Sequence, residues 1–239
     1  MKKTKILILL ILLVLLCGCN IKEKVVVDPY GKVSQEVTVP IVSSGIKESS
    51  IKDYTETILD QYKTVLNVRK YTYDVEYGKT TSNIIFKNSF DSICEYVKNT
   101  VFSQYIYKHI ECIEDDEYIT IENVTDHIDY CGACADWPSL DDVTYSITLP
   151  VKSVEDDADM VNNKTYTWKF DKNTTADKEI YLKISKKDLA TNLKAYEKGE
   201  QRKDVLKKVL LIVIVIGILA GGFVVAKVLY KKYEENREY

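Results

Sequence analysis

Two apolar runs stand near the ends of the chain, and the region between them repeats apolar residues with two different periods. Residues 6–16 and 209–226 contain no charged side chain. Between them, short stretches rich in β-branched and aromatic residues are separated by turn residues, which is typical of strands. Other, longer stretches repeat apolar residues every three or four positions, which is typical of helices. The pattern predicts an α+β domain between two apolar ends.

The clearest local signal is a β-hairpin over residues 24–39, KVVVDPYGKVSQEVTV. Valine-rich arms flank Asp28, Pro29 and Gly31, which occupy positions i, i+1 and i+3 of a type I turn. The second arm alternates imperfectly between apolar and polar residues. Residues 20–23 are expected to precede the first strand as a short connection.

The remaining elements are read from spacing and turn signals. Helices are predicted over residues 48–67 and 90–106, and a third begins at the Ser185–Asp188 pattern, which resembles a capping box. Strands are predicted over residues 71–77, 82–86, 117–124 and 143–149, and residues 164–170 and 179–184 are predicted to pair as a last hairpin. The third helix is expected to weaken at Gly199 within a stalk, residues 185–208. The fold class is therefore α+β, with a mostly antiparallel sheet, two or three helices and a C-terminal transmembrane helix.

The N-terminal run has the layout of a bacterial lipoprotein signal peptide. Lysines within residues 2–5 precede an apolar core of about ten residues, which is too short to span a bilayer comfortably. The core ends on Leu16-Cys17-Gly18-Cys19, which resembles the lipobox. The resemblance implies that residues 1–18 are removed and that the sulfur of Cys19 carries a diacylglycerol lipid. The alternatives are an uncleaved signal anchor and an ordinary cleavage site.

The C-terminal run, residues 209–226, predicts a transmembrane helix about 27 Å long. Lysines flank both of its ends, so the positive-inside rule barely decides its orientation. Export of the middle region would leave residues 227–239 in the cytoplasm. Gly217 and Gly221 form a G-x-x-x-G spacing that permits a homodimer through this helix. The alternative is that glycine is simply frequent in membrane helices.

Composition and charge narrow the class of protein. Only 9 glycines and 4 prolines, with 46% hydrophobic residues, favour a folded core over disorder. Residues 19–184 give room for one domain of ordinary size. Residues 20–206 carry a formal charge of about −9, which repels phosphate polymers. We therefore expect no nucleic-acid partner.

The layout of the whole chain resembles the LppM-like bacterial lipoproteins. The resemblance rests on the lipobox, the hairpin around residues 28–31, the unit DADMVNNKTYTWKFD at residues 157–171 and one C-terminal span. It implies an envelope-located α+β domain and offers no catalytic residues. Residues 49–142 match this layout poorly and are interpreted as an insert. Trp168 is expected to face the core.

Four cysteines in the middle region carry the remaining candidate chemistry: Cys94, Cys112, Cys131 and Cys134. An exported domain permits structural disulfides, and we favour the pairs Cys94–Cys112 and Cys131–Cys134, while the other pairings stay open. A redox dithiol at Cys131 and Cys134 is disfavoured, because surrounding aspartates oppose a thiolate. A zinc site with His109 or His127 lacks a second C-x-x-C pair.

Three classes of function remain. The first is a non-catalytic, membrane-anchored envelope lipoprotein that binds a partner or acts as a scaffold. The second is an extracytoplasmic thiol–disulfide redox protein that uses Cys131 and Cys134. The third is a membrane sensor or adaptor that signals through residues 227–239. We expect the first, with no enzymatic activity, no metal and no cofactor. The membrane and an unidentified envelope protein are its expected partners.

Overall fold

The computed structural model describes residues 19–42, 45–68, 70–100, 110–123, 140–171 and 179–235. The chain divides into two compact units, residues 1–192 and 193–239. The first unit is an α+β domain that contains two sheets, and the second continues a long helix that begins in the first.

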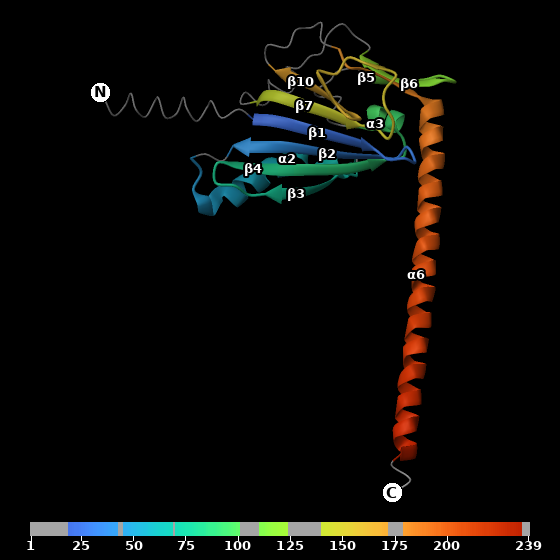
Figure 1. Ribbon diagram of the computed structural model, residues 1–239. Helices are drawn as coiled ribbons and strands as arrows, with labels where there is room; N and C mark the ends of the chain where they lie inside the picture. The colour runs from blue at the N-terminus through green and yellow to red at the C-terminus, as the bar shows by residue number, and fades with distance from the viewer. Residues whose placement is uncertain are drawn as a thin grey trace, which may run out of the picture. The chain divides into compact units, whose positions relative to one another are not determined.

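Seven strands form the larger sheet, in the order β3-β4-β2-β1-β7-β10-β9 (Figure 1). Their bounds are β1 Cys19–Val27, β2 Val33–Val42, β3 Thr72–Glu76, β4 Thr81–Phe90, β7 Leu140–Thr148, β9 Met160–Asn162 and β10 Thr165–Asp171. Every neighbouring pair is antiparallel except β1 and β7, which run parallel. The α+β class with a mostly antiparallel sheet is confirmed.

The predicted hairpin is formed by β1 and β2 and turns at Asp28. The Asp28 carboxylate accepts hydrogen bonds from the backbone N–H groups of Tyr30, at 2.8 Å, and Lys32, at 2.9 Å. Gly31 has a φ of +83°, a left-handed conformation that glycine adopts at no steric cost. The expected connection over residues 20–23 is instead part of β1, because these residues pair with β7 on one side and, from residue 22, with β2 on the other.

Four strands form the smaller sheet, in the order β5-β6-β11-β8. Their bounds are β5 Ile110–Glu114, β6 Tyr118–Asn123, β8 Glu155–Asp156 and β11 Tyr181–Ser185. The predicted last hairpin of β10 with β11 is wrong. The whole length of β10 pairs with β7 in the larger sheet, whereas β11 pairs with β6 and β8. Both strands nevertheless bury their apolar side chains in one core, which explains their similar patterns.

The helices are η1 Glu48–Ser50, α2 Ile51–Val68, α3 Ile93–Asn99 and α6 Lys186–Glu235. The first predicted helix is confirmed by η1 and α2. The second is shorter than predicted: Ser92 caps α3 by accepting the N–H of Glu95 at 3.1 Å, and Thr100 leaves the helix with an extended backbone. Thr100 turns away because its hydroxyl bonds to Gln35 inside the core. The predicted continuation over residues 101–106 lies outside the described residues.

The third predicted helix begins as expected and continues further. The Ser185 hydroxyl accepts the N–H of Asp188 at 3.1 Å, so the capping residue is confirmed. The helix α6 passes Gly199 without interruption, contrary to the expected weakening. A single glycine costs only about 1 kcal/mol relative to alanine and removes no backbone hydrogen bond. Among the residues whose side chains the structure describes, which in α6 end at residue 211, no helix combines the length and apolar character needed to cross a membrane.

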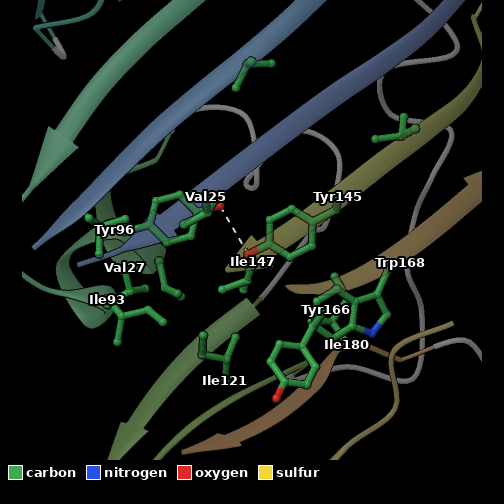
Figure 2. Packing of buried hydrophobic residues seen from close by; sticks show 14 of the residues in the cluster. Val25, Val27, Ile93, Tyr96, Ile121, Tyr145, Ile147, Tyr166, Trp168 and Ile180 are labelled. Carbon is green, nitrogen blue, oxygen red and sulfur yellow. Dashed lines mark hydrogen bonds between the residues drawn. The ribbon is translucent and has the colours of Figure 1, made fainter. Parts of the chain in front are cut away.

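The inward side chains of both sheets, α2 and α3 form one hydrophobic cluster (Figure 2). Trp168 on β10 is fully buried, which confirms its predicted place in the core. Its ring packs against Tyr145 of β7, with 5.6 Å between the centroids. Residues 49–142 contribute α2, α3 and the strands β3 to β6 to this same domain.

Candidate functional site

A carboxyl group lies in the middle of this core. Glu23 occupies an inward position of β1, between Ile21 and Val25, and is 1% exposed. Its Oε1 accepts two short hydrogen bonds, from Gln35 Nε2 and from the Tyr96 hydroxyl, each at 2.6 Å. Its Oε2 is buried and has no hydrogen-bond partner among the described residues. Glu23 is therefore a buried acid held through one oxygen.

The hydrogen bonds continue from Glu23 into neighbouring elements. Gln35 on β2 also donates to the Thr100 hydroxyl at 2.7 Å, and its Oε1 accepts the Tyr71 hydroxyl at 2.6 Å. The Tyr96 hydroxyl of α3 lies 3.2 Å from that of Tyr145 on β7, and Figure 2 shows the two directed toward each other. This polar cluster joins α3 to three strands of the larger sheet.

Burial dominates the electrostatics of the polar cluster. It raises the pKa of Glu23 to about 7, although the hydrogen bonds from Tyr96 and Gln35 act in the opposite direction. Burial and then the Glu23 charge raise the pKa of Tyr96 well above its ordinary value, and the same two causes raise the pKa of Tyr145. Both phenols therefore stay neutral while Glu23 exchanges its proton close to neutral pH.

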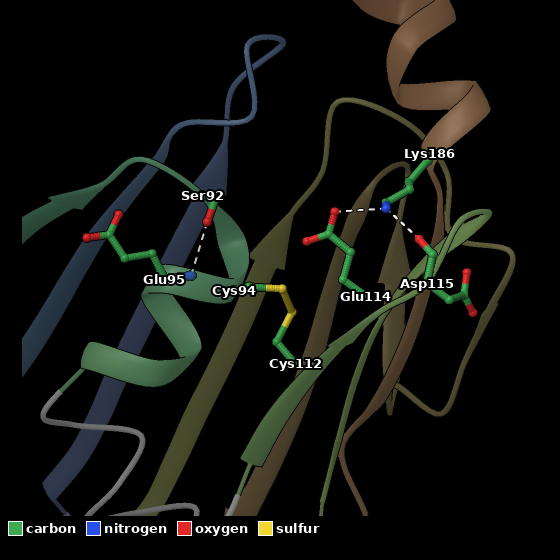
Figure 3. Close-up of a disulfide and its surroundings, with 7 residues drawn as sticks. All are labelled: Ser92, Cys94, Glu95, Cys112, Glu114, Asp115 and Lys186. Carbon is green, nitrogen blue, oxygen red and sulfur yellow. Dashed lines mark hydrogen bonds and ion pairs between the residues drawn. A yellow bond between two sulfur atoms is a disulfide. The ribbon is translucent and has the colours of Figure 1, made fainter.

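A disulfide links α3 to the smaller sheet (Figure 3). Cys94 on α3 and Cys112 on β5 are joined, with 5.1 Å between their Cα atoms, and this confirms the favoured pairing. Cys131 and Cys134 lie outside the described residues, as do His109 and His127, the histidines considered for zinc. In the part of the chain that the structure describes, no three His, Cys, Asp or Glu side chains are arranged to hold a metal ion.

The first turn of α6 is attached to the turn between β5 and β6. Lys186 forms an ion pair with Glu114 at 2.8 Å, and its ammonium also donates to the backbone oxygen of Asp115 (Figure 3). The backbone N–H of Lys186 donates to the oxygen of Glu117 at 3.0 Å. The N–H groups of Tyr118 and Glu117 lower the pKa of Asp115. The start of α6 and the disulfide thus share one strand, β5.

A second carboxylate connects the two sheets. Asp157 precedes β9, and its Oδ1 accepts the indole N–H of Trp168 and the backbone N–H of Tyr181, each at 2.7 Å. Trp168 belongs to the larger sheet and Tyr181 to the smaller one. Burial raises the pKa of Asp157, although both hydrogen bonds favour its ionised form. Asp157 is a structural link in this arrangement.

The sequence-predicted sites occupy separate parts of the fold. Cys19 is the first residue of β1, and its Cα pairs with that of Leu140 at the start of β7. Gly217 and Gly221 fall within α6, beyond the part of that helix whose side-chain environment is described. Sequence reasoning missed Glu23 and Gln35. The available signal was their two-residue spacing from the inward apolar residues of each strand.

Comparisons with known proteins give one structural likeness. No protein-family model matches the chain, and no curated protein matches it significantly. The chain is similar to the NMR structure of the folded domain of LppM from Mycobacterium tuberculosis. That likeness has a TM-score of 0.42 and 10% sequence identity, over 70% of this chain and 90% of the other.

Proposed function

We propose that the protein is a non-catalytic bacterial envelope lipoprotein that presents its α+β domain outside the cytoplasm as a binding or scaffold module. Lipidated Cys19 attaches the start of the domain to the membrane, and residues 209–226 of α6 span the membrane. Residues 227–239 then lie in the cytoplasm. In this proposal the envelope partner is a protein, and Gly217 and Gly221 offer a close-packing face for a second copy of the helix.

The disulfide between Cys94 and Cys112 is the observation that carries the proposal. Such bonds persist in oxidising compartments and are rare where glutathione keeps thiols reduced. The bond closes a loop of 18 residues in sequence and joins α3 to β5. It therefore supports export of the domain, which is also what the lipobox-like sequence implies.

The position of Cys19 at the start of β1 adds a geometric argument. A lipid on Cys19 would be attached directly to a strand that pairs on both sides, with no connection between anchor and sheet. Residues 186–208 provide about 34 Å of helix between the domain and the proposed span.

Substitution of Cys19 tests the proposed lipid anchor. We expect Cys19→Ala to abolish incorporation of labelled acyl chains and to leave the signal peptide attached. Cys17→Ala is the matched control, because position 17 would leave with the signal peptide, and this variant should be lipidated and cleaved as usual. Lipid labelling that persists in Cys19→Ala would contradict the proposed site.

Fractionation of the same variant tests the proposed span. Cys19→Ala should still sediment with membranes, because residues 209–226 remain. If it appeared in the soluble fraction, the C-terminal segment would not span the membrane.

A further inference from the structure

The contact between α3 and the larger sheet depends on one ionisable group. Tyr96 in the middle of α3 and Thr100 just after its end both enter the polar cluster. Tyr96 bonds to Glu23 directly, and Thr100 bonds to Gln35, which itself bonds to Glu23. A helix of seven residues does not persist in water by itself, so such tertiary contacts hold it in place.

The groups around Glu23 do not compensate a negative charge. Among the described residues these groups are Gln35 on β2, Tyr96 on α3 and Tyr145 on β7, and Gln35 is in turn bonded to Thr100 and Tyr71. All of these are neutral at physiological pH, and none of the described groups that contact Glu23 is a cation. An ionised Glu23 in the closed core is therefore an uncompensated buried charge, which is costly unless water reaches it. The unpartnered Oε2 adds to this cost.

We propose that Glu23 is a proton switch for the docking of α3 against the larger sheet. With its proton bound, the carboxyl group stays in the core and α3 is docked. When α3 separates from the sheet, Glu23 reaches water and releases its proton to the solvent. The disulfide at Cys94 keeps the N-terminal half of α3 on β5, so the segment that separates is residues 96–100.

The direction of the pH effect follows from the pKa values of the two states. Burial raises the pKa of Glu23 from 4.5 to about 7 in the docked state, and exposure to water restores the lower value. The docked state therefore binds the proton more tightly. Docking is strongest below pH 4.5, weakens as the pH rises from 4.5 to 7, and changes no further above that range.

Hydrogen exchange of the full-length chain in detergent micelles tests the switch. After correction for the pH dependence of intrinsic exchange, we expect the amides of residues 96–100 to lose at least about tenfold of their protection between pH 5 and pH 7.5. Glu23→Gln should remove this dependence. Glu36→Gln, which changes an exposed carboxylate on the outer face of β2, should retain it.

Tyr96→Phe provides a second measurement that needs no change at Glu23. The Tyr96 hydroxyl favours the ionised carboxylate, so its removal should move the upper end of the transition to higher pH. The proposal is overturned if the wild-type protein shows no loss of protection, or if Glu23→Gln shows the same loss. If Glu23→Gln does not fold, Tyr96→Phe decides: a shift to higher pH supports the switch, and an unchanged transition rejects it.

Discussion

At the residue scale, some inward strand positions are occupied by polar side chains, which are buried in the core together with the apolar ones. Gln35 follows the two-residue spacing of Val33 and Val37, and it is 2% exposed. Burying a polar group without a hydrogen-bond partner costs free energy. A glutamine is therefore tolerated at such a position only where neighbouring residues form hydrogen bonds with its side-chain amide. Gln35 satisfies this condition with three partners from three different parts of the chain.

Replacement of Gln35 should therefore lower the unfolding free energy by more than the loss of its own hydrogen bonds would, because its partners also lose theirs. Gln35→Leu leaves the Tyr71 and Thr100 hydroxyls in the core without this partner, and we expect the unfolding free energy to fall by about 2–3 kcal/mol. Urea unfolding followed by tryptophan fluorescence measures the change. Glu36→Leu, on the exposed face of the same strand, should change it by less than about 0.5 kcal/mol. Equal effects of the two substitutions would show that the polar cluster contributes nothing.

Gly31 allows a separate test of backbone conformation in the hairpin turn. A methyl group at Gly31 would meet no atom within 4 Å, so only its φ of +83° resists a side chain. Gly31→Ala should lower the unfolding free energy by about 1 kcal/mol, and Gly31→Asn by less, because asparagine tolerates left-handed backbone better. Thermal unfolding of both variants measures this order. A larger loss for Asn than for Ala would contradict the conformational explanation.

At the scale of elements, β5 is the strand on which covalent and ionic contacts meet. Cys112 joins it to α3, and Glu114 at its end pairs with the first residue of α6. The ion pair is partly exposed, and such pairs contribute at most about 1 kcal/mol. The disulfide is therefore the stronger of the two connections.

Removal of the disulfide should have a measurable cost. For a loop of this length, restriction of the unfolded chain corresponds to about 3 kcal/mol, so Cys94→Ser with Cys112→Ser should lower the unfolding free energy by about that amount. Reductant should destabilise the wild-type domain and affect the double variant much less. Free-thiol mapping by mass spectrometry provides the direct check, and alkylation of Cys94 or Cys112 in the native, unreduced protein would contradict this pairing.

At the scale of the whole molecule, the lipid on Cys19 and the C-terminal span have different roles in the proposed arrangement. The C-terminal span alone would retain the protein in the membrane, so the lipid on Cys19 is expected to restrict orientation. The lipid holds the start of β1, and the hairpin tip at Tyr30 lies at the other end of that strand. Restriction of one end limits the positions available to the tip.

A dye at position 30, introduced as an unnatural amino acid, reports on this restriction. Energy transfer to labelled lipid should give a narrow distribution of distances from the bilayer in the wild-type protein and a broader one in Cys19→Ala. Cys17→Ala should match the wild type. Identical broad distributions in all three proteins would leave the lipid with no positioning role.

The sequence by itself determined the features whose hydrogen bonds join near neighbours. The turn at Asp28, the helix α2 and the cap at Ser185 each depend on groups at most four residues apart, so local chemistry identified them. The disulfide partner of Cys94 was favoured from sequence, but other pairings remained possible until the fold brought α3 beside β5.

Tertiary structure alone decided which strands pair across long separations. The parallel contact of β1 with β7 and the assignment of β10 and β11 to different sheets depend on residues far apart in the chain, which local patterns do not encode. The early end of α3 has the same origin, because Thr100 bonds to a strand 65 residues away. Glu23 became a candidate site only when β1, β2, α3 and β7 closed around it and removed its carboxyl group from water.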